Sequence, residues 1–238
     1  MDIKQPLIGI IGGMGAFSSL EFMDTIYKFN RPYISDQQAP RIICVSDTNI
    51  HDRTSSILHN CCDSLPDSVN SIINKLLYFE IDIIVIACIT FHFYFKLLPP
   101  EIQEKTVNLI DIIKRELKKH NKSAVLLATL GTYKSGIING KNVIIPSLEQ
   151  QRKIHSLIYE IKKVGKDPVL LDELMINIEN MKNEFRTNLV IAGCTEIHIA
   201  VKYFKENKLL NDITFIDPLF TIGVNINNIL SLKKGENF

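Results

Sequence analysis

Two cysteines stand in matched surroundings, one in each half of the chain. Cys88 and Cys194 each end a short apolar run and begin a Cys-x-x-x-His segment. A buried strand that ends in this way places a sulfur near the first amides of the next helix, where ligands bind in open α/β sheets. Backbone amides and a helix dipole favour the thiolate, so such a thiol can be partly ionised at neutral pH. Two thiols facing one cleft would suit proton transfer by two bases.

The composition limits the class of protein. The chain has 238 residues, 46% of them hydrophobic and 22% charged, which is typical of a globular protein. A formal net charge of +1 argues against nucleic acid as a partner. No apolar run approaches the length of about 18 residues that crosses a bilayer, and the first residues lack a signal-peptide pattern. The five cysteines show no Cys-x-x-Cys pair. We therefore expect reduced thiols, no membrane association and a cytoplasmic location.

Alternating apolar runs and amphipathic stretches predict an α/β fold with parallel strands. Strands are expected at 6–12, 41–46 and 81–88, and helices from about 18, at 64–79 and at 101–119. The second half repeats this order, with a strand and glycine turn at 124–132, a helix at 151–163 and a strand at 188–194. A last strand at 213–217 and a helix at 218–232 are expected to return to the first lobe. The predicted division is 1–118 plus 208–238 for one lobe and 119–207 for the other.

Several residues near the predicted strand ends could bind a small anion. The turn Gly12-Gly-Met-Gly15 lacks the Gly-x-Gly-x-x-Gly spacing of a dinucleotide site, so it either brings backbone amides close to a carboxylate or is only a tight turn. Arg53 follows the second strand and either holds a carboxylate or lies on the surface. Hydroxyls of Thr90 and Thr195 either bind carboxylate oxygens or cap helices. His92 and His198 lack a compelling fourth ligand, so no metal is expected.

Five motifs in this order resemble the cofactor-independent aspartate/glutamate racemases. They are Gly9-Ile-Ile-Gly-Gly-Met-Gly15, Asp52-Arg-Thr54, Ala87-Cys-Ile-Thr-Phe-His92, Ala128-Thr-Leu-Gly-Thr132 and Gly193-Cys-Thr-Glu196. The resemblance runs nearly end to end. It implies two similar Rossmann-like lobes with parallel sheets, related by pseudo-twofold symmetry, with the active site between them. It also implies a homodimer, a small-molecule amino acid substrate and no cofactor.

The resemblance assigns roles to individual residues. Cys88 and Cys194 would act as a thiolate/thiol pair on opposite faces of the amino acid. Lysine is common at helix ends in any case, but the family's Ile-Tyr…Lys-x-Gly pattern selects Lys163 rather than Lys162. The implied substrate contacts are Met14, Gly15, Arg53, Ile89, Thr90, Thr129, Thr132, Lys163 and Thr195.

One position departs from the family pattern in a way that bears on the substrate. Residue 89 is Ile where the family has Asn, so an amide expected to contact the α-carboxylate or amino group is replaced by an apolar side chain. An unpaired buried polar group costs about 1–3 kcal/mol, which predicts an unusual substrate or weak activity. Phe91 replaces a usual Ala, and Ala16 with Phe17 replaces Pro-Glu, while Glu196 is typical of the aspartate branch.

Three functions fit these residues. The first is racemisation of aspartate, glutamate or a related amino acid by the two cysteines. The second keeps the superfamily but changes the reaction to that of a hydantoin racemase or maleate isomerase, with one thiol as a nucleophile. The third is a degenerate racemase that only binds a small carboxylate because of Ile89.

Overall fold

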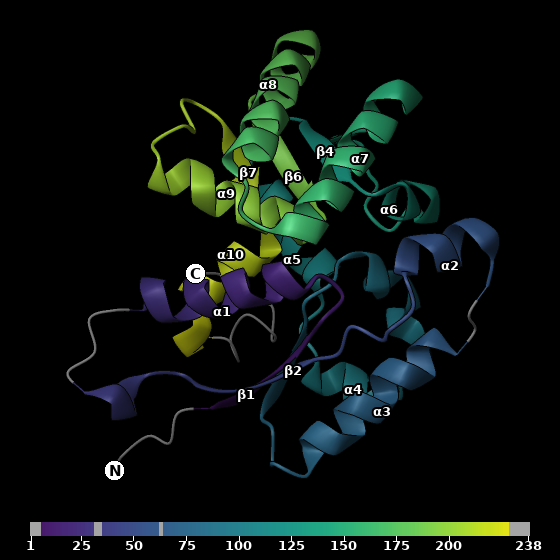
Figure 1. The fold of residues 1–238 in the computed structure, drawn as a ribbon, viewed down its shortest axis with the longest axis vertical. Coiled ribbons are helices and arrows are strands. Elements are labelled where there is room, and N and C mark those ends of the chain that lie inside the picture. Colours follow the sequence, from purple (N-terminus) through teal and green to yellow (C-terminus); the bar gives the residue numbers. More distant parts are fainter. Residues whose placement is uncertain (1–5, 31–34, 62–63, 229–238) are drawn as a thin grey trace.

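The molecule consists of two α/β lobes joined by a layer of helices. The structure is a computed structural model that describes residues 6–30, 35–61 and 64–228. In Figure 1 the first lobe holds β1, β2, α3 and α4, and the second holds β4, β6, β7, α7, α8 and α9, with α1, α5 and α10 between them. No helix in the described ranges is both long and apolar enough to span a membrane.

Each lobe is built on a parallel sheet. The first sheet has the order β2-β1-β3, with β1 at Leu7–Gly12, β2 at Arg41–Ser46 and β3 at Ile83–Ile86. The second has the order β5-β4-β6-β7, with β4 at Ala124–Ala128, β5 at Val143–Ile144, β6 at Leu189–Gly193 and β7 at Thr214–Ile216. Because the first three strands of each half follow the same spatial order, the predicted α/β duplication is confirmed.

The helices follow the predicted pattern, except that the helix at Pro168–Phe185 was not predicted and two predicted helices differ in their bounds. They are α1 (Ala16–Phe29), α2 (Arg53–His59), α3 (Leu65–Leu77), the 3₁₀ helix η2 (Thr90–Leu97), α4 (Pro100–Lys105), α5 (Leu109–Lys119), α6 (Leu130–Ser135), α7 (Leu148–Val164), α8 (Pro168–Phe185), α9 (Glu196–Glu206) and α10 (Pro218–Val224), with short 3₁₀ turns at Asp36–Gln38 and Ile226–Asn228. The predicted helix 101–119 is two helices, because Thr106 bridges to β3 and the Asn108 side chain caps α5. The predicted helix 218–232 ends earlier, and its residues 229–232 lie outside the described residues.

Strand alternation divides the apolar side chains among three cores. On β4, Ala124, Leu126 and Ala128 face a core shared by both lobes, whereas Val125 and Leu127 face a core under α7, α8 and α9. The same period of two sends Ile8 and Ile10 of β1 to the shared core, and its other side chains to a third core under α3. Both faces of each sheet are therefore covered, which explains why the strands read as continuous apolar runs.

The two cysteines occupy equivalent positions in this pattern. Side chains 83, 85 and 87 face the shared core, while 84, 86 and Cys88 face the outer core of the first lobe. In the second lobe, 189 and 191 face the shared core, while 190, 192 and Cys194 face the other outer core. Cys88 thus follows β3 and Cys194 follows β6, strands that occupy equivalent places in the two sheets. Both side chains point away from the shared core.

The last strand corrects one expectation. We assigned 208–217 to the first lobe, but β7 pairs with β6 and extends the second sheet, with Val190 opposite Phe215. Its edge position there lets Ile216 complete the shared core. The helix that follows, α10, packs on α1 and α5 in the layer of helices between the lobes.

Candidate active site

Cys194 lies buried at the start of α9 and is hydrogen bonded to an acidic neighbour. Its side chain is 5% exposed, and Sγ donates to Oε2 of Glu196 at 2.7 Å. Burial and the charge of Glu196 raise the pKa of Cys194 well above its usual value. The expectation of a partly ionised thiol is therefore wrong for this cysteine, because local charge and burial outweigh the helix dipole.

Cys88 lies beside a buried arginine. The thiol is 4% exposed, and Arg53, the first residue of α2, is 6% exposed. Burial alone would lower the pKa of Arg53, but the charge of the Cys88 sulfur and that of Asp52 raise it. The Arg53 Nη atoms donate to the carbonyl groups of Ile50, His51 and Met14, while Nε has no partner. Arg53 is thus a fixed interior cation, not a solvated surface residue.

The two lysines at the end of α7 are arranged opposite to our expectation, which placed Lys163 and not Lys162 at the substrate. Lys163 points to solvent, with 64% of its side chain exposed, and pairs with Glu160. Lys162 is 23% exposed and lies over the ring of Tyr159. Burial alone would lower the pKa of Lys162, but the charges of Glu196 and Cys194 raise it. One residue advances a helix by about 100°, so only one of two adjacent lysines can face the thiols, and it is Lys162.

Asp52 and Tyr159 connect the two lobes beside these charges. The Asp52 carboxylate accepts the amide of Ser55 as the N-cap of α2, and the Tyr159 hydroxyl donates to both its oxygens at 2.9 and 3.0 Å. Lys162 Nζ lies 3.8 Å from the same carboxylate. Burial raises the pKa of Tyr159 to about 12, so the phenol remains a donor. Arg53 and Lys162 are thereby held on opposite lobes at fixed positions.

A cluster of buried threonines closes the gap between α2, η2 and α6. Thr54 donates to Thr129 at 3.1 Å, and Thr90 pairs with Thr132 at 2.9 Å. Thr129 also caps α6 through the amide of Thr132. The approach is close enough that a Cβ on Gly131 would lie 2.7 Å from Cα of Thr54. Of the predicted contacts, Thr90, Thr129 and Thr132 are thus brought together, and Thr54 joins them.

The glycine turn lies against the second cysteine motif. The Met14 carbonyl accepts from Arg53, and Gly15 precedes α1. A Cβ on Gly15 would lie only 2.1 Å from Oε1 of Glu196, so a side chain there would displace that carboxylate. Oε1 is buried and has no hydrogen-bond partner. Thr195 does not cap α9, and its hydroxyl instead accepts from Ser18 at 3.3 Å.

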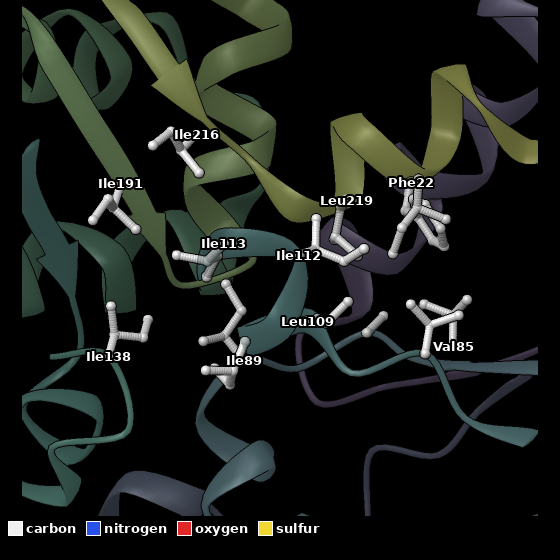
Figure 2. Close-up of a cluster of buried hydrophobic side chains, with 14 of the residues drawn as sticks. Phe22, Val85, Ile89, Leu109, Ile112, Ile113, Ile138, Ile191, Ile216 and Leu219 are labelled. Atoms are coloured by element: carbon white, nitrogen blue, oxygen red, sulfur yellow. The ribbon is translucent and has the colours of Figure 1, made fainter. Parts of the chain in front are cut away.

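Ile89 does not line this site. Its side chain is 1% exposed and belongs to the shared core. Figure 2 shows it among Leu109, Ile113 and Ile138, which come from both lobes. The backbone enters the helical region at Ile89, three residues after β3 ends, and the side chain there points into the shared core. Our placement of Ile89 at the substrate is therefore corrected: the change from Asn removes an amide and adds an apolar contact between the lobes.

The two histidines of the cysteine motifs are engaged in structural hydrogen bonds. His92 Nδ1 bonds the Cys88 carbonyl at 2.9 Å, and Nε2 accepts the amide of Leu109. Burial lowers the pKa of His92, in keeping with a neutral ring. His198 contacts Asp217 at 2.7 Å and Thr25 at 2.9 Å. Among the described residues, no three His, Cys, Asp or Glu side chains are grouped as a metal site would require.

Sequence reasoning missed four residues that shape the site. The sequence indicates only that Glu196 is typical of the aspartate branch of the family. Asp52, Thr54 and Tyr159 occur in the family motifs without a role of their own. A signal for Tyr159 and Lys162 was present, since residues three apart share a helix face. The same spacing pairs Glu160 with Lys163 on the solvent side.

Comparison with known proteins identifies the family. The model of the family Asp/Glu/Hydantoin racemase matches residues 11–220. The chain belongs to this racemase family. Aspartate racemase of Picrophilus torridus is 26% identical, with a TM-score of 0.76 and 94% of each chain covered.

Two more distant structures share the fold of this chain. An aspartate racemase homologue from Pyrococcus horikoshii OT3 is 19% identical, with a TM-score of 0.68, over 97% of this chain and 100% of that one. Glutamate racemase of Campylobacter jejuni subsp. jejuni is also 19% identical, with a TM-score of 0.54, over 97% of this chain and 86% of that one. The predicted two-lobed racemase fold is therefore confirmed.

Proposed function

We propose that this chain interconverts the enantiomers of an acidic amino acid, aspartate or glutamate, by proton transfer at Cα between Cys88 and Cys194. The observation that carries the proposal is the equivalence of the two thiols. Both are buried, and each follows the corresponding strand of its lobe on the same side of the sheet. Lys162 interacts electrostatically with Cys194 and with Arg53, and Arg53 interacts with Cys88, so both thiols belong to one charge network.

The charges of this network suit an amino dicarboxylate. Arg53 keeps an unpaired Nε donor and Lys162 supplies a second cation, which together fit two carboxylates. Lys162 takes the role that we expected of Lys163. The hydroxyls of Thr90, Thr129, Thr132 and Thr195, with the backbone at Met14 and Gly15, are the proposed polar contacts of the α-carboxylate.

The proposed reaction moves one proton in and one proton out. A thiolate takes the Cα proton, and the C–H electron pair stays on the substrate, spread over Cα and the α-carboxylate. The opposite thiol then delivers its proton to the other face and becomes a thiolate. Fixed donors in a water-poor site stabilise the developing charge more than they would in water. The chain's own cations supply this stabilisation, so the proposal includes no cofactor.

The test is exchange of Cα hydrogen for deuterium in D₂O. Each enantiomer of aspartate and glutamate is incubated with the protein, and exchange and inversion are followed by NMR and circular dichroism. We expect exchange with both hands of one amino acid. Cys88→Ser and Cys194→Ser should each impair hydrogen removal from a different hand, while Cys44→Ser, which changes a thiol in the first sheet, should leave both intact.

Three outcomes would contradict the proposal or redirect it. Equal effects of both active-site variants on both hands would refute the two-base assignment. Turnover of a hydantoin or an unsaturated diacid with no amino acid exchange would favour the second function. A thermal shift with aspartate or glutamate but no exchange would favour binding alone. The packing of Ile89 in the core counts against that third function, because the Ile89 side chain does not fill the site in place of the amide.

The assembly and location remain part of the proposal. By its resemblance to the family, we expect a homodimer in solution, which sedimentation velocity would test. The cytoplasmic location expected from the sequence would be tested by fractionation of the native cell.

A further inference from the structure

We infer that Glu196 is a positioning residue that makes the two thiols unequal: it holds the proton on Cys194, so the resting site carries its thiolate on Cys88. The inference rests on the proposed function for its kinetic consequence. The location of the proton can be tested in the protein without substrate, so this part of the inference does not depend on turnover.

The surroundings of Cys194 favour the thiol. Its Sγ lies 2.7 Å from Oε2 of Glu196, the arrangement of a thiol that donates to a carboxylate, and a carboxylate can only accept. Glu196 is 1% exposed, and its other oxygen faces Gly15 without a partner. Lys162 of α7 and Arg53 of α2 also interact with this carboxylate. The charge of Lys162 also lowers the pKa of Cys194, but by less than burial and the charge of Glu196 raise it. A thiolate at Cys194 would therefore stand directly beside a buried negative charge.

The surroundings of Cys88 are opposite in sign. The charge that acts on this sulfur comes from the Arg53 guanidinium, which is held by three backbone carbonyl groups. The adjacent His92 bonds the Cys88 carbonyl and has both ring nitrogens engaged, so it adds a neutral ring. A cation beside one thiol and a carboxylate beside the other direct the single shared proton to Cys194.

This inequality has a consequence for each turnover. The resting form accepts only the hand whose Cα hydrogen faces Cys88. After inversion, Cys88 holds the proton and Cys194 is a thiolate next to Glu196, so the return of the proton to Cys194 is favoured. The opposite enantiomer binds productively only to the minor form, in which Cys194 is the thiolate. Its apparent affinity is therefore reduced in proportion to the small fraction of protein in that form. Because enantiomers have equal free energies, kcat/KM must be the same in both directions, so the inequality appears in kcat and KM separately.

The first test is alkylation of the intact protein without substrate. Samples are treated with iodoacetamide across a pH series, and each cysteine is quantified by peptide mass spectrometry. In the wild type we expect Cys88 to reach its full rate at a lower pH than Cys194, since only the thiolate reacts readily. Glu196→Gln keeps the shape but removes the charge, and it should raise the Cys194 rate about tenfold near neutral pH, as one pKa unit would.

Two variants control for charge and shape. Glu196→Asp keeps a carboxylate and should leave the Cys194 rate closer to that of the wild type than Glu196→Gln does. Glu149→Gln removes an exposed carboxylate from α7 and should change neither cysteine. Equal reaction of both thiols in the wild type, or an unchanged Cys194 rate in a folded Glu196→Gln, would overturn the inference. The wild-type pH series decides the matter even if Glu196→Gln does not fold.

The second test uses the two enantiomers as substrates. In the wild type we expect KM and kcat to differ between hands by about fivefold or more, in equal proportion, and Glu196→Gln should bring both ratios toward one. Equal constants for both hands in the wild type would contradict the inference. Absence of any turnover, with the alkylation order as expected, would instead count against the proposed racemisation.

Discussion

Substitution of Ile89 separates two views of the position at which this chain departs from its family. If the side chain lined the substrate site, Ile89→Asn would restore a polar contact and raise activity. In the structure the side chain is fully buried in the core that both lobes share, among Leu109, Ile113 and Ile138. Ile89→Asn should then weaken the packing between the two lobes and lower the free energy of unfolding.

The cost follows from burial. Removing a buried Ile side chain forfeits about 1.5–3 kcal/mol of apolar transfer. An amide left there without partners adds about 1–3 kcal/mol. We therefore expect Ile89→Asn to lower the free energy of unfolding by about 2.5–6 kcal/mol, a large part of the 5–15 kcal/mol typical of a protein. Ile89→Val removes one methylene and should cost only about 0.5–1.5 kcal/mol.

Urea unfolding followed by circular dichroism measures these differences. The matched control is Ile176→Asn, the same chemical change on an exposed face of α8 where the side chain is 61% accessible, and it should stay within about 0.5 kcal/mol. Activity of Ile89→Val should equal that of the wild type. An Ile89→Asn protein that is as stable as the control, or that gains kcat/KM, would refute the core placement.

Three further substitutions test the charge networks. Lys162→Ala should lower kcat/KM about 10- to 100-fold, since a hydrogen bond to a charged group contributes about 1.5–3 kcal/mol, whereas Lys163→Ala should change it less than about twofold; equal effects would refute the assignment of the two lysines. Lys202→Met removes a buried ammonium on α9 that bonds Glu21 and Asp24 of α1, and it should cost about 1.5–3 kcal/mol in urea unfolding, the contribution of hydrogen bonds to a charged group; no loss would show that these bonds contribute nothing. Ion pairs with Lys166 and Lys28 lower the pKa of Glu206 to about 2, so its stabilising contribution is present above its unfolded pKa of about 4.5 and is lost as the pH falls toward 2. Glu206→Gln should therefore flatten the acid limb of a pH–stability curve, and an unchanged limb would contradict the sign of that shift.

The fold was largely predictable because its strands are buried on both faces. Continuous apolar runs such as Ala124–Ala128 occur where helices cover a sheet twice, and they marked both lobes. The matched cysteine motifs then located equivalent strand ends. The position of β7 was not predictable, because three residues of strand do not specify which sheet edge they join.

The orientation of single side chains at the site could not be read from the motifs. Ile89 and Thr90 are adjacent, yet one enters the shared core and the other the threonine cluster. Lys162 and Lys163 differ by one step on a helix and face opposite environments. A family pattern fixes residue types, but the direction of each side chain depends on a backbone turn or a helical phase that only the packed elements define.

The contacts between the lobes differ in kind on the two sides of the thiols, and this difference governs access. Both sulfurs are almost fully buried, so a substrate reaches them only when some contacts part. On one side the lobes share an apolar core, whose exposure costs about 25 cal/mol for each Å². On the other side they meet through hydroxyl groups and the Tyr159–Asp52 pair, where each hydrogen bond contributes about 1 kcal/mol net because water replaces it. The polar side therefore separates at the lower cost, and its groups are the ones that a dicarboxylate substrate can bond in turn.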